Sequence, residues 1–313
     1  MVVRTNPAYQ GWVPLTTWAN DLGLGKPVVT LAGTNLVALL AFPGGRLALT
    51  LGRQQARWQD AEFWLAFAPR LVRGRGCIHA LDVEKTLSPL LADSGEPIIS
   101  NRVVVLDPGH GGRNPGAQNL ATGRWEKEYT LDWARRLKPL LEKRGWKVFL
   151  TRTNDSDVPL GDRVALADAQ QAGVFLSLHF NHAVSNPGEA GIETYCVTPA
   201  GLPSSIVRGP PEEPFEVLPN NAFDDENLRL ALRLQHGLTR RTSALDRGVR
   251  RTRFMGVLRG QVRPAVLIEG GYLSNLSEAR LIAAEEYRQR LAQAVAEALE
   301  AEAAPAVLPT AGP

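Results

Sequence analysis

The sequence is poor in cysteine: its 313 residues include only Cys77 and Cys196, which lie far apart. Two such cysteines cannot build a disulfide framework, and they match none of the spacings of cysteine-based zinc sites. We therefore predict two buried free thiols. Long apolar runs are also missing, because no stretch of about 18 apolar residues occurs, and this argues against a transmembrane helix.

Other signals are missing as well. The first residues, MVVRTNPAYQGW, lack the apolar core of a signal peptide. The chain has no Lys/Arg run and no basic residues interleaved with aromatics, so nothing favours a nucleic-acid partner. The net charge of +3 and isoelectric point near 9.0 are compatible with an anionic polymer as partner. Hydrophobic residues make up 44% of the chain, which is ordinary for a globular protein with a sizeable core.

The length predicts two domains, since one domain typically takes about 150 residues. Residues 11–92 combine a strand-helix unit with several apolar runs, and 77–91 look like a second copy of that unit, which indicates a small α+β domain. Residues 93–101 are polar with Gly and Pro and indicate a linker. Residues 102–300 alternate strands with helices, which predicts an α/β domain with a mostly parallel sheet and helices on both faces. Residues 301–313 are rich in Pro and Ala and predict a disordered tail.

Hydrophobic periodicity and turn residues place the elements of the second domain. Buried strands are expected at 103–106, 146–151, 174–178 and 264–268, and an edge or antiparallel strand at 191–197. Helices are expected at 126–143, 163–171, 224–243 and 277–302. Residues 199–223 contain six prolines and predict a long loop, either a lid or disordered.

Three buried strands end in residues that bind metals or carry protons, namely His110, His179 and Glu269. Because the C-terminal ends of parallel strands meet at one edge of a sheet, we expect these side chains to converge. Glu126 opens the helix that follows the His110 loop and is a fourth candidate. Two histidines and a carboxylate with an open fourth position form a zinc arrangement used for hydrolysis. A further carboxylate such as Glu269 can take the proton of the activated water.

Several alternatives stay open at this level. The spacing is not a local H-E-x-x-H signature, so a metal site and structural histidines are about equally favoured. Glu128 could replace Glu126 as a ligand, and His182 could approach the metal or line a groove. Asp107 either orients a ligand imidazole or caps a turn. Asn181 is a candidate for contact with a substrate.

Five separated blocks of the second domain carry more specific information. They are VVVLDPGHGGRNPGA (103–117), EKEYTL (126–131), VFLTRTNDSDVPLGDRVALA (148–167), SLHFN (177–181) and PAVLIEGGYLSNLSE (264–278). In this order they resemble the zinc-dependent N-acetylmuramoyl-L-alanine amidases of the Amidase_3 type, which trim peptidoglycan. The resemblance implies a three-layer α/β fold and hydrolysis of the amide bond between N-acetylmuramic acid and L-alanine. It also implies an extracytoplasmic location, in the periplasm or cell wall.

The resemblance also implies roles for individual residues. Zinc would be held by His110, Glu126 and His179, and Glu269 would be the catalytic residue. Two positions depart from the usual pattern of the family. SLHFN has Phe180 where a small residue is usual, and EGGYLSN has Gly270 where Thr or Ala is common. Both lie beside the expected site, and neither removes a functional atom.

Residues 11–92 resemble the copper amine oxidase N-terminal-like domain, a stalk module, through Trp12-Val13-Pro14-Leu15, Leu22-Gly23 and the returning unit at 77–91. The resemblance implies no copper, and it leaves room for a regulatory or wall-binding partner. The tryptophans of this domain could stack on glycans, but a core position is favoured because Trp buries a large area. Two other functions stay open: a non-catalytic peptidoglycan-binding or scaffold protein, and a zinc peptidase acting on another cell-wall amide.

Overall fold

The structure is a computed structural model that describes residues 11–42, 45–92, 98–209 and 211–302. The expected tail from 303 onward and the first half of the expected linker lie outside the described residues. The N-terminal part contains β1 (Trp12–Pro14), α1 (Leu15–Asp21), β2 (Val28–Ala32), β3 (Asn35–Phe42), β4 (Gly45–Thr50), β5 (Gln55–Trp58), β6 (Ala61–Trp64), β7 (Arg70–Val72), β8 (Arg75–His79), α2 (Ala80–Asp82), η2 (Val83–Leu87) and α3 (Ser88–Leu91).

The second part begins after the expected linker. It contains β9 (Val103–Pro108), α4 (Glu126–Glu142), β10 (Lys147–Leu150), α5 (Leu160–Ala169), β11 (Val174–Asn181), β12 (Ile192–Val197), η3 (Pro219–Phe223), α6 (Asp224–Thr242), β13 (Asp246–Thr252), α7 (Gly256–Arg259), β14 (Ala265–Tyr272), α8 (Leu276–Ala283) and α9 (Glu285–Glu302). Among the described residues, no helix is long and apolar enough to cross a membrane. Both cysteines are free and buried, as expected.

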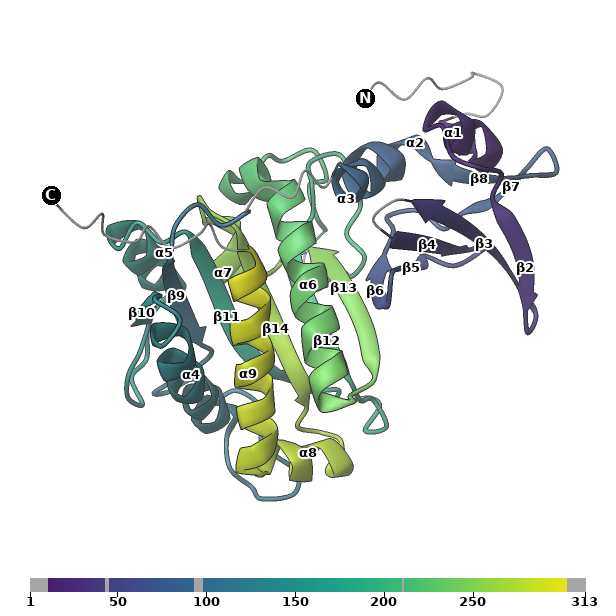
Figure 1. Ribbon diagram of the computed structural model, residues 1–313. Coiled ribbons are helices and arrows are strands. Elements are labelled where there is room, and N and C mark those ends of the chain that lie inside the picture. The colour runs from purple at the N-terminus through teal and green to yellow at the C-terminus, as the bar shows by residue number, and fades with distance from the viewer. Residues whose placement is uncertain (1–10, 43–44, 93–97, 210, 303–313) are drawn as a thin grey trace, which may run out of the picture.

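One sheet runs through both parts of the chain, in the order β10-β9-β11-β14-β12-β13-β6-β5-β4-β3-β2 (Figure 1). Strands β10, β9, β11 and β14 are neighbours in this order and all pair in parallel. Strand β12 is antiparallel to β14, and β13 is parallel to β12. The expected α/β fold with a mostly parallel sheet in the second part is therefore confirmed. Strands β1, β8 and β7 form a separate small sheet.

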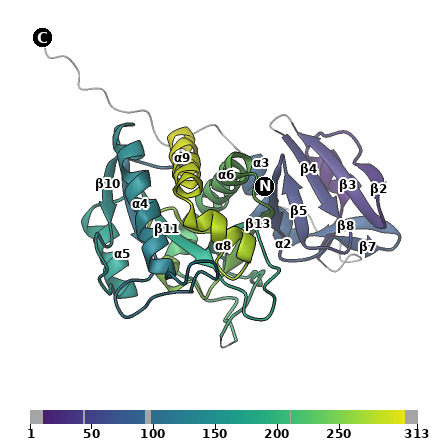
Figure 2. The same cartoon turned by 90° about the horizontal axis from the view of Figure 1, so that it is seen from below.

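Helices cover both faces of the second part of the sheet. Helices α4, α6 and α9 lie on one face, while α5 and the short α7 lie on the other (Figures 1 and 2). Strand alternation divides the buried side chains accordingly: Val104 and Leu106 join the large core under α4 and α9, and Val105 joins the smaller core under α5 and α7. The continuous apolar run of β9 therefore serves two cores, which is why it shows no alternation.

The structure adds to or differs from the expected elements in three places. Strand β12 is antiparallel as expected but lies inside the sheet, because β13 covers its other side. Strand β13 was not expected, since DRGVRRT is as polar as a loop; two of its three arginines bond to neighbouring elements, Arg247 to Glu193 and Arg251 to Thr86. The single helix expected at 277–302 is broken at Ala284, where buried Arg288 donates to the carbonyls of Ile282 and Ala284.

The N-terminal part is attached through β6, which pairs with β13. Phe63 and Val249 are the paired residues, and both are buried. On either side of Phe63, the backbone N–H of Glu62 donates to Asp246 (2.9 Å), and the Trp64 indole N–H donates to the carbonyl of Arg247 (3.2 Å). The large core extends from Val13 to Leu299, so the two parts share one apolar interior.

The second half of the expected linker is also packed. Ile98 and Ile99 are buried in the large core. Asn101 caps the entry to β9 by accepting from the backbone N–H of Val103 and donates to the carbonyl of Gln171. These contacts leave the described part of this segment little freedom to act as a hinge.

The proline-rich segment expected at 199–223 is organised by one arginine. The guanidinium of buried Arg253 donates to the carbonyls of Pro199 (2.8 Å), Pro214 (2.9 Å) and Glu216 (2.9 Å). Its last five residues form the 3-10 helix η3. The described residues of the segment are thus folded against the end of β13.

The two departures from the family pattern lie next to each other on the α4 face of the sheet. Phe180 is 1% exposed and packs against Trp133, with ring centroids 5.5 Å apart. A Cβ atom at Gly270 would lie 2.9 Å from Trp133, 3.0 Å from Phe180 and 3.1 Å from Leu291. The large side chain at 180 and the missing side chain at 270 therefore complement each other.

We predict that Gly270→Ala lowers the free energy of unfolding by about 1–3 kcal/mol, because the added methyl group overpacks this core. In a Phe180→Leu background the same change should cost less, since part of the crowding is removed. Urea unfolding of the two single variants and the double variant measures the coupling. Equal costs in both backgrounds would show that Phe180 and Gly270 do not compete for space.

A buried carboxylate supports the junction of the two parts. Asp82 is 0% exposed and accepts from the backbone N–H groups of Ala66 (2.9 Å) and Phe67 (2.8 Å) and from the Thr86 hydroxyl. Burial raises the pKa of Asp82 to about 6 from its ordinary 3.8, although these hydrogen bonds and the charge of Arg251 oppose the shift. The folded protein therefore binds a proton at Asp82 more tightly than the unfolded chain does.

This raised pKa predicts a pH-dependent stability. The contribution of protonated Asp82 is fully present below about pH 4 and is lost as the pH rises through about 6, a change of about 3 kcal/mol. Asp82→Asn should not show this loss of stability. The free energy of unfolding of wild type should therefore fall relative to that of the variant between pH 4 and pH 7. Denaturant unfolding at several pH values measures the difference, with exposed Asp60→Asn as a control that should follow wild type.

Candidate active site

The candidate residues meet at the C-terminal ends of three adjacent parallel strands. His110 lies two residues beyond β9, and His179 and Glu269 are paired residues of β11 and β14. Glu126 is the first residue of α4. Alternation along the strands directs His179 and Glu269 to the α5 face, because their neighbours Leu178 and Ile268 belong to the core on the other face.

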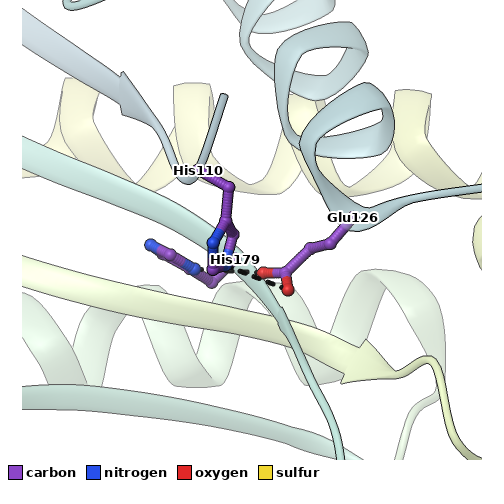
Figure 3. A group of neighbouring side chains, drawn as sticks. All are labelled: His110, Glu126 and His179. Atoms are coloured by element: carbon purple, nitrogen blue, oxygen red, sulfur yellow. Dashed lines mark hydrogen bonds and ion pairs between the residues drawn. The ribbon is translucent and has the colours of Figure 1, made fainter. Parts of the chain in front are cut away.

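Three of these side chains converge on one point (Figure 3). His110 Nε2 lies 3.0 Å from Glu126 Oε2, and His179 Nδ1 lies 3.0 Å from Glu126 Oε1. One ligand atom from each residue lies within 4.8 Å of the others. Two imidazoles and a carboxylate at this spacing can hold a divalent metal ion and leave a coordination position open.

Glycines make room for this convergence. A Cβ atom at Gly109 would lie 2.2 Å from the His179 ring, and one at Gly116 would lie 2.6 Å from Glu126 Oε2 and 2.7 Å from His110. Gly111 and Gly112, which follow His110, face the segment at Arg152–Asp157 instead. His110 itself has a φ of +63°, a conformation that is costly for a residue with a side chain and is often kept at functional sites.

Neighbouring groups orient His110. The Asn114 amide oxygen lies 3.0 Å from His110 Nδ1, and Arg163 donates to the His110 carbonyl (2.9 Å). The oxygens of Asp107 accept from Thr151, Arg163 and Ser177. Asp107 therefore contacts no imidazole, and it acts on His110 only through Arg163. Asn114 was missed from the sequence, although it lies inside the first of the five blocks, 103–117.

Glu126 is 3% exposed and receives four polar contacts. Besides the two imidazoles, the backbone N–H groups of Ala117 and Phe180 donate to it at 3.0 Å each. Burial works to raise the pKa of Glu126, but the hydrogen bonds and charges of His110 and His179 hold it well below its ordinary value. In turn, burial lowers the pKa of His110, but Glu126 and Asn114 raise it above its ordinary value. The site thus keeps Glu126 as an anion.

Glu269 has the opposite character. Its Oε2 atom is buried and has no hydrogen-bond partner among the described residues. Burial, followed by the negative charges of Glu126 and Glu193, raises the pKa of Glu269 well above its ordinary value. A carboxyl group of this kind can hold a proton at neutral pH and exchange it with a bound molecule.

Glu193 is a buried residue of this site that the sequence did not single out. It is 2% exposed and is paired with Glu269 across β12 and β14. Its oxygens accept from the Arg247 guanidinium (2.5 Å), the Tyr195 hydroxyl and the Asn181 amide (3.3 Å). The alternation of residues 191–197 could have placed Glu193 and Tyr195 on one face, but the distant pairing with Glu269 has no local signal.

The structure places the rival residues elsewhere. Glu128 accepts from Arg124 and from the backbone N–H of Trp125, so it closes the capping box of α4 and stays away from the histidines. His182 lines a separate cleft. Asn181 uses its amide nitrogen on Glu193 and its oxygen on the backbone N–H of His182. Both ends of the Asn181 amide are thus engaged within the protein.

Comparison with known proteins was made on the sequence and on the fold. The profile of the Amidase_3 family, N-acetylmuramoyl-L-alanine amidase, matches residues 104–301. N-acetylmuramoyl-L-alanine amidase AmiC of Neisseria meningitidis serogroup B is 32% identical over 222 residues, covering 63% of this chain and 52% of the relative. AmiA of Escherichia coli K12 is 31% identical over 217 residues, covering 63% of this chain and 74% of the relative. The chain thus spans about half the length of the Neisseria relative.

Solved structures agree with the sequence matches. The amidase AmiC2 of Nostoc punctiforme is 30% identical, with a TM-score of 0.53 over 64% of this chain and 96% of that chain. The catalytic domain of CwlV from Bacillus (Paenibacillus) polymyxa is 29% identical, with a TM-score of 0.52 over 63% of this chain and 96% of that chain. The family profile covers most of the second part, including the candidate ligands His110, Glu126 and His179. This chain therefore belongs to the Amidase_3 family of N-acetylmuramoyl-L-alanine amidases.

Proposed function

We propose that this chain is a zinc-dependent hydrolase that cleaves the amide bond between N-acetylmuramic acid and L-alanine in peptidoglycan, outside the cytoplasm. The observation that carries the proposal is the convergence of His110, Glu126 and His179, with Glu269 on the next strand. Several relatives of this chain are named for the same amidase activity.

The donor set fits zinc. It combines two imidazole nitrogens and a buried carboxylate, whose low pKa keeps it ionised. His110, Glu126 and His179 would hold the ion, and the Asn114 contact would orient the His110 ring. When bound, zinc supplies a Lewis acid that polarises the scissile carbonyl and makes a water molecule acidic at neutral pH.

Glu269 moves the proton in this proposal. Its Oε2 atom, buried and without a partner among the described residues, takes a proton from the attacking water. The same oxygen then delivers that proton to the nitrogen of L-alanine, which leaves as an amine. The raised pKa of Glu269 favours holding the proton between these two transfers.

Metal binding tests the ligand set. We predict that the full chain binds one zinc ion, and that His110→Ala loses both zinc and cleavage of a muramyl peptide. His182→Ala is the matched control, since His182 lies only three positions beyond His179 yet faces another cleft; it should keep its zinc. Elemental analysis of dialysed protein gives the stoichiometry. Retention of full zinc by His110→Ala would contradict the assignment.

Proton transfer is tested separately. We predict that Glu269→Gln lowers kcat by about 10²–10⁴-fold while zinc binding is kept, because the amide cannot take a proton from water. Glu128→Gln is the control and should keep both zinc and activity. Mass spectrometry of the products identifies the bond that is cut. A loss of less than about tenfold would overturn the role of Glu269, and cleavage elsewhere would indicate another cell-wall amide. Wall binding without zinc or turnover would favour a scaffold.

A further inference from the structure

The candidate active site is continued by a row of side chains on the same face of the sheet. Glu193 of β12 is paired with Glu269, and Tyr195, two residues on, is paired with Arg250 of β13. The Arg250 guanidinium then lies over the ring of Trp64 in β6, 4.0 Å from its centroid. The row thus leads from the catalytic carboxylate into the N-terminal part of the chain, which adjoins β13 (Figure 1).

Arg250 has hydrogen-bonding capacity that the protein does not use. Its side chain is only 13% exposed, and Nε is buried without a hydrogen-bond partner among the described residues. Its nearest acidic group is Glu193, at 3.4 Å, but both oxygens of Glu193 already accept from Arg247, Tyr195 and Asn181. A guanidinium carries five N–H donors, and a largely buried one without hydrogen bonds is rare.

Arg253, the first residue after β13, shows a contrast at the terminal nitrogens. It is likewise buried, and its Nε also lacks a partner among the described residues, but its terminal nitrogens donate to three backbone carbonyls. The planar guanidinium of Arg250 instead stacks on the indole ring of Trp64. This contact holds the guanidinium rigid and leaves its terminal nitrogens available. This geometry suits a planar anion that accepts two parallel hydrogen bonds, and a carboxylate is such a group.

We infer that Arg250, supported by Trp64, forms a subsite that binds a carboxylate of the peptide stem of the substrate. The inference deepens the proposed function and rests on it. The lactyl carboxyl group of N-acetylmuramic acid forms the scissile amide and carries no charge. The free carboxylates near the scissile bond therefore belong to the peptide. Arg250 lies two strands from Glu269, about 10 Å across the sheet, and an extended peptide advances about 3.3 Å per residue. The subsite is thus within reach of the first two or three stem residues.

The surface beyond Trp64 has a matching charge. An open cleft of about 550 Å³ is lined by Trp64, Trp12, Arg53 and Arg70 among others, and its described lining contains no acidic residue. Arg70 lies over the Trp12 ring, 4.1 Å from its centroid, and so repeats the arrangement of Arg250 on Trp64. Beside Trp64, the N-terminal part therefore offers a cleft with positive charge supported by an aromatic ring.

The junction holds this subsite in place. Trp64 donates to the carbonyl of Arg247, and Glu62 donates through its backbone to Asp246. Trp64 is thereby fixed against the strand that carries Arg250. Because neither partner has to be ordered when substrate binds, the entropic cost of forming the subsite is small.

Paired substrates test the inference. The probes are a muramyl tripeptide with free stem carboxylates and the same compound with those carboxylates converted to amides. In the zinc-loaded full chain, the acid should have a KM about tenfold lower than the amide, with similar kcat. Arg250→Gln should raise KM for the acid about tenfold, leave the amide unchanged and so remove the preference. Arg57→Gln, an exposed arginine of the N-terminal part, is the matched control and should keep it.

Two further variants protect the test against misfolding. Arg250→Lys keeps the positive charge but loses the planar guanidinium, and Trp64→Leu removes the ring beneath it. Both variants should therefore reduce the preference for the acid over the amide to about threefold. Equal weakening of acid and amide in Arg250→Gln, or equal affinity of wild type for both, would overturn the subsite. Binding of the two probes to Glu269→Gln by calorimetry gives the same comparison without turnover. Cleavage of neither probe by wild type would contradict the proposed function, whereas that binding comparison would still decide the subsite.

Discussion

The carboxylate of Glu126 is removed from water, at 3% exposure, and an ion in that position is tolerated only when donors surround it. The donors are the rings of His110 and His179 and the backbone N–H groups of Ala117 and Phe180. They come from the loop after β9, from β11 and from the segment before α4. One buried charge therefore fixes the mutual position of three elements, and the convergence of His110, Glu126 and His179 follows from it.

The close approach of these side chains also explains the backbone conformation of the loop between β9 and α4. The loop between β9 and α4 must bring His110 and Glu126 together while letting His179 reach past Gly109. Gly116 and the positive φ of His110 are the conformational consequences. Arg163 holds the loop from the other side, joining the His110 carbonyl to the buried Asp107. The strain of the loop is thus balanced by contacts made elsewhere in the catalytic part.

Strand β12, which is antiparallel to β14, adds a third carboxylate beside Glu126 and Glu269. It sets Glu193 opposite Glu269, and the pairing of β13 with β6 then carries the same face into the N-terminal part. The stalk-like resemblance of residues 11–92 stays a prediction, but this part shares its core and its sheet with the second part of the chain. The local sequences of β6 and β13 do not predict this pairing, because its partners Phe63 and Val249 lie nearly 190 positions apart.

The sequence by itself determined the strands that lead to His110, His179 and Glu269, because buried parallel strands are short apolar runs followed abruptly by polar residues. Strands β11 and β14 continue past these residues to Asn181 and Tyr272. The choice of Glu126 over Glu128 needed the family resemblance, and the structure shows its physical basis: Glu128 is used by the helix cap. Only the tertiary structure placed Glu193, Asn114 and Arg250 near the candidate site. Their partners lie on other elements or several residues away, so no local periodicity encodes them, and packing alone brings them together.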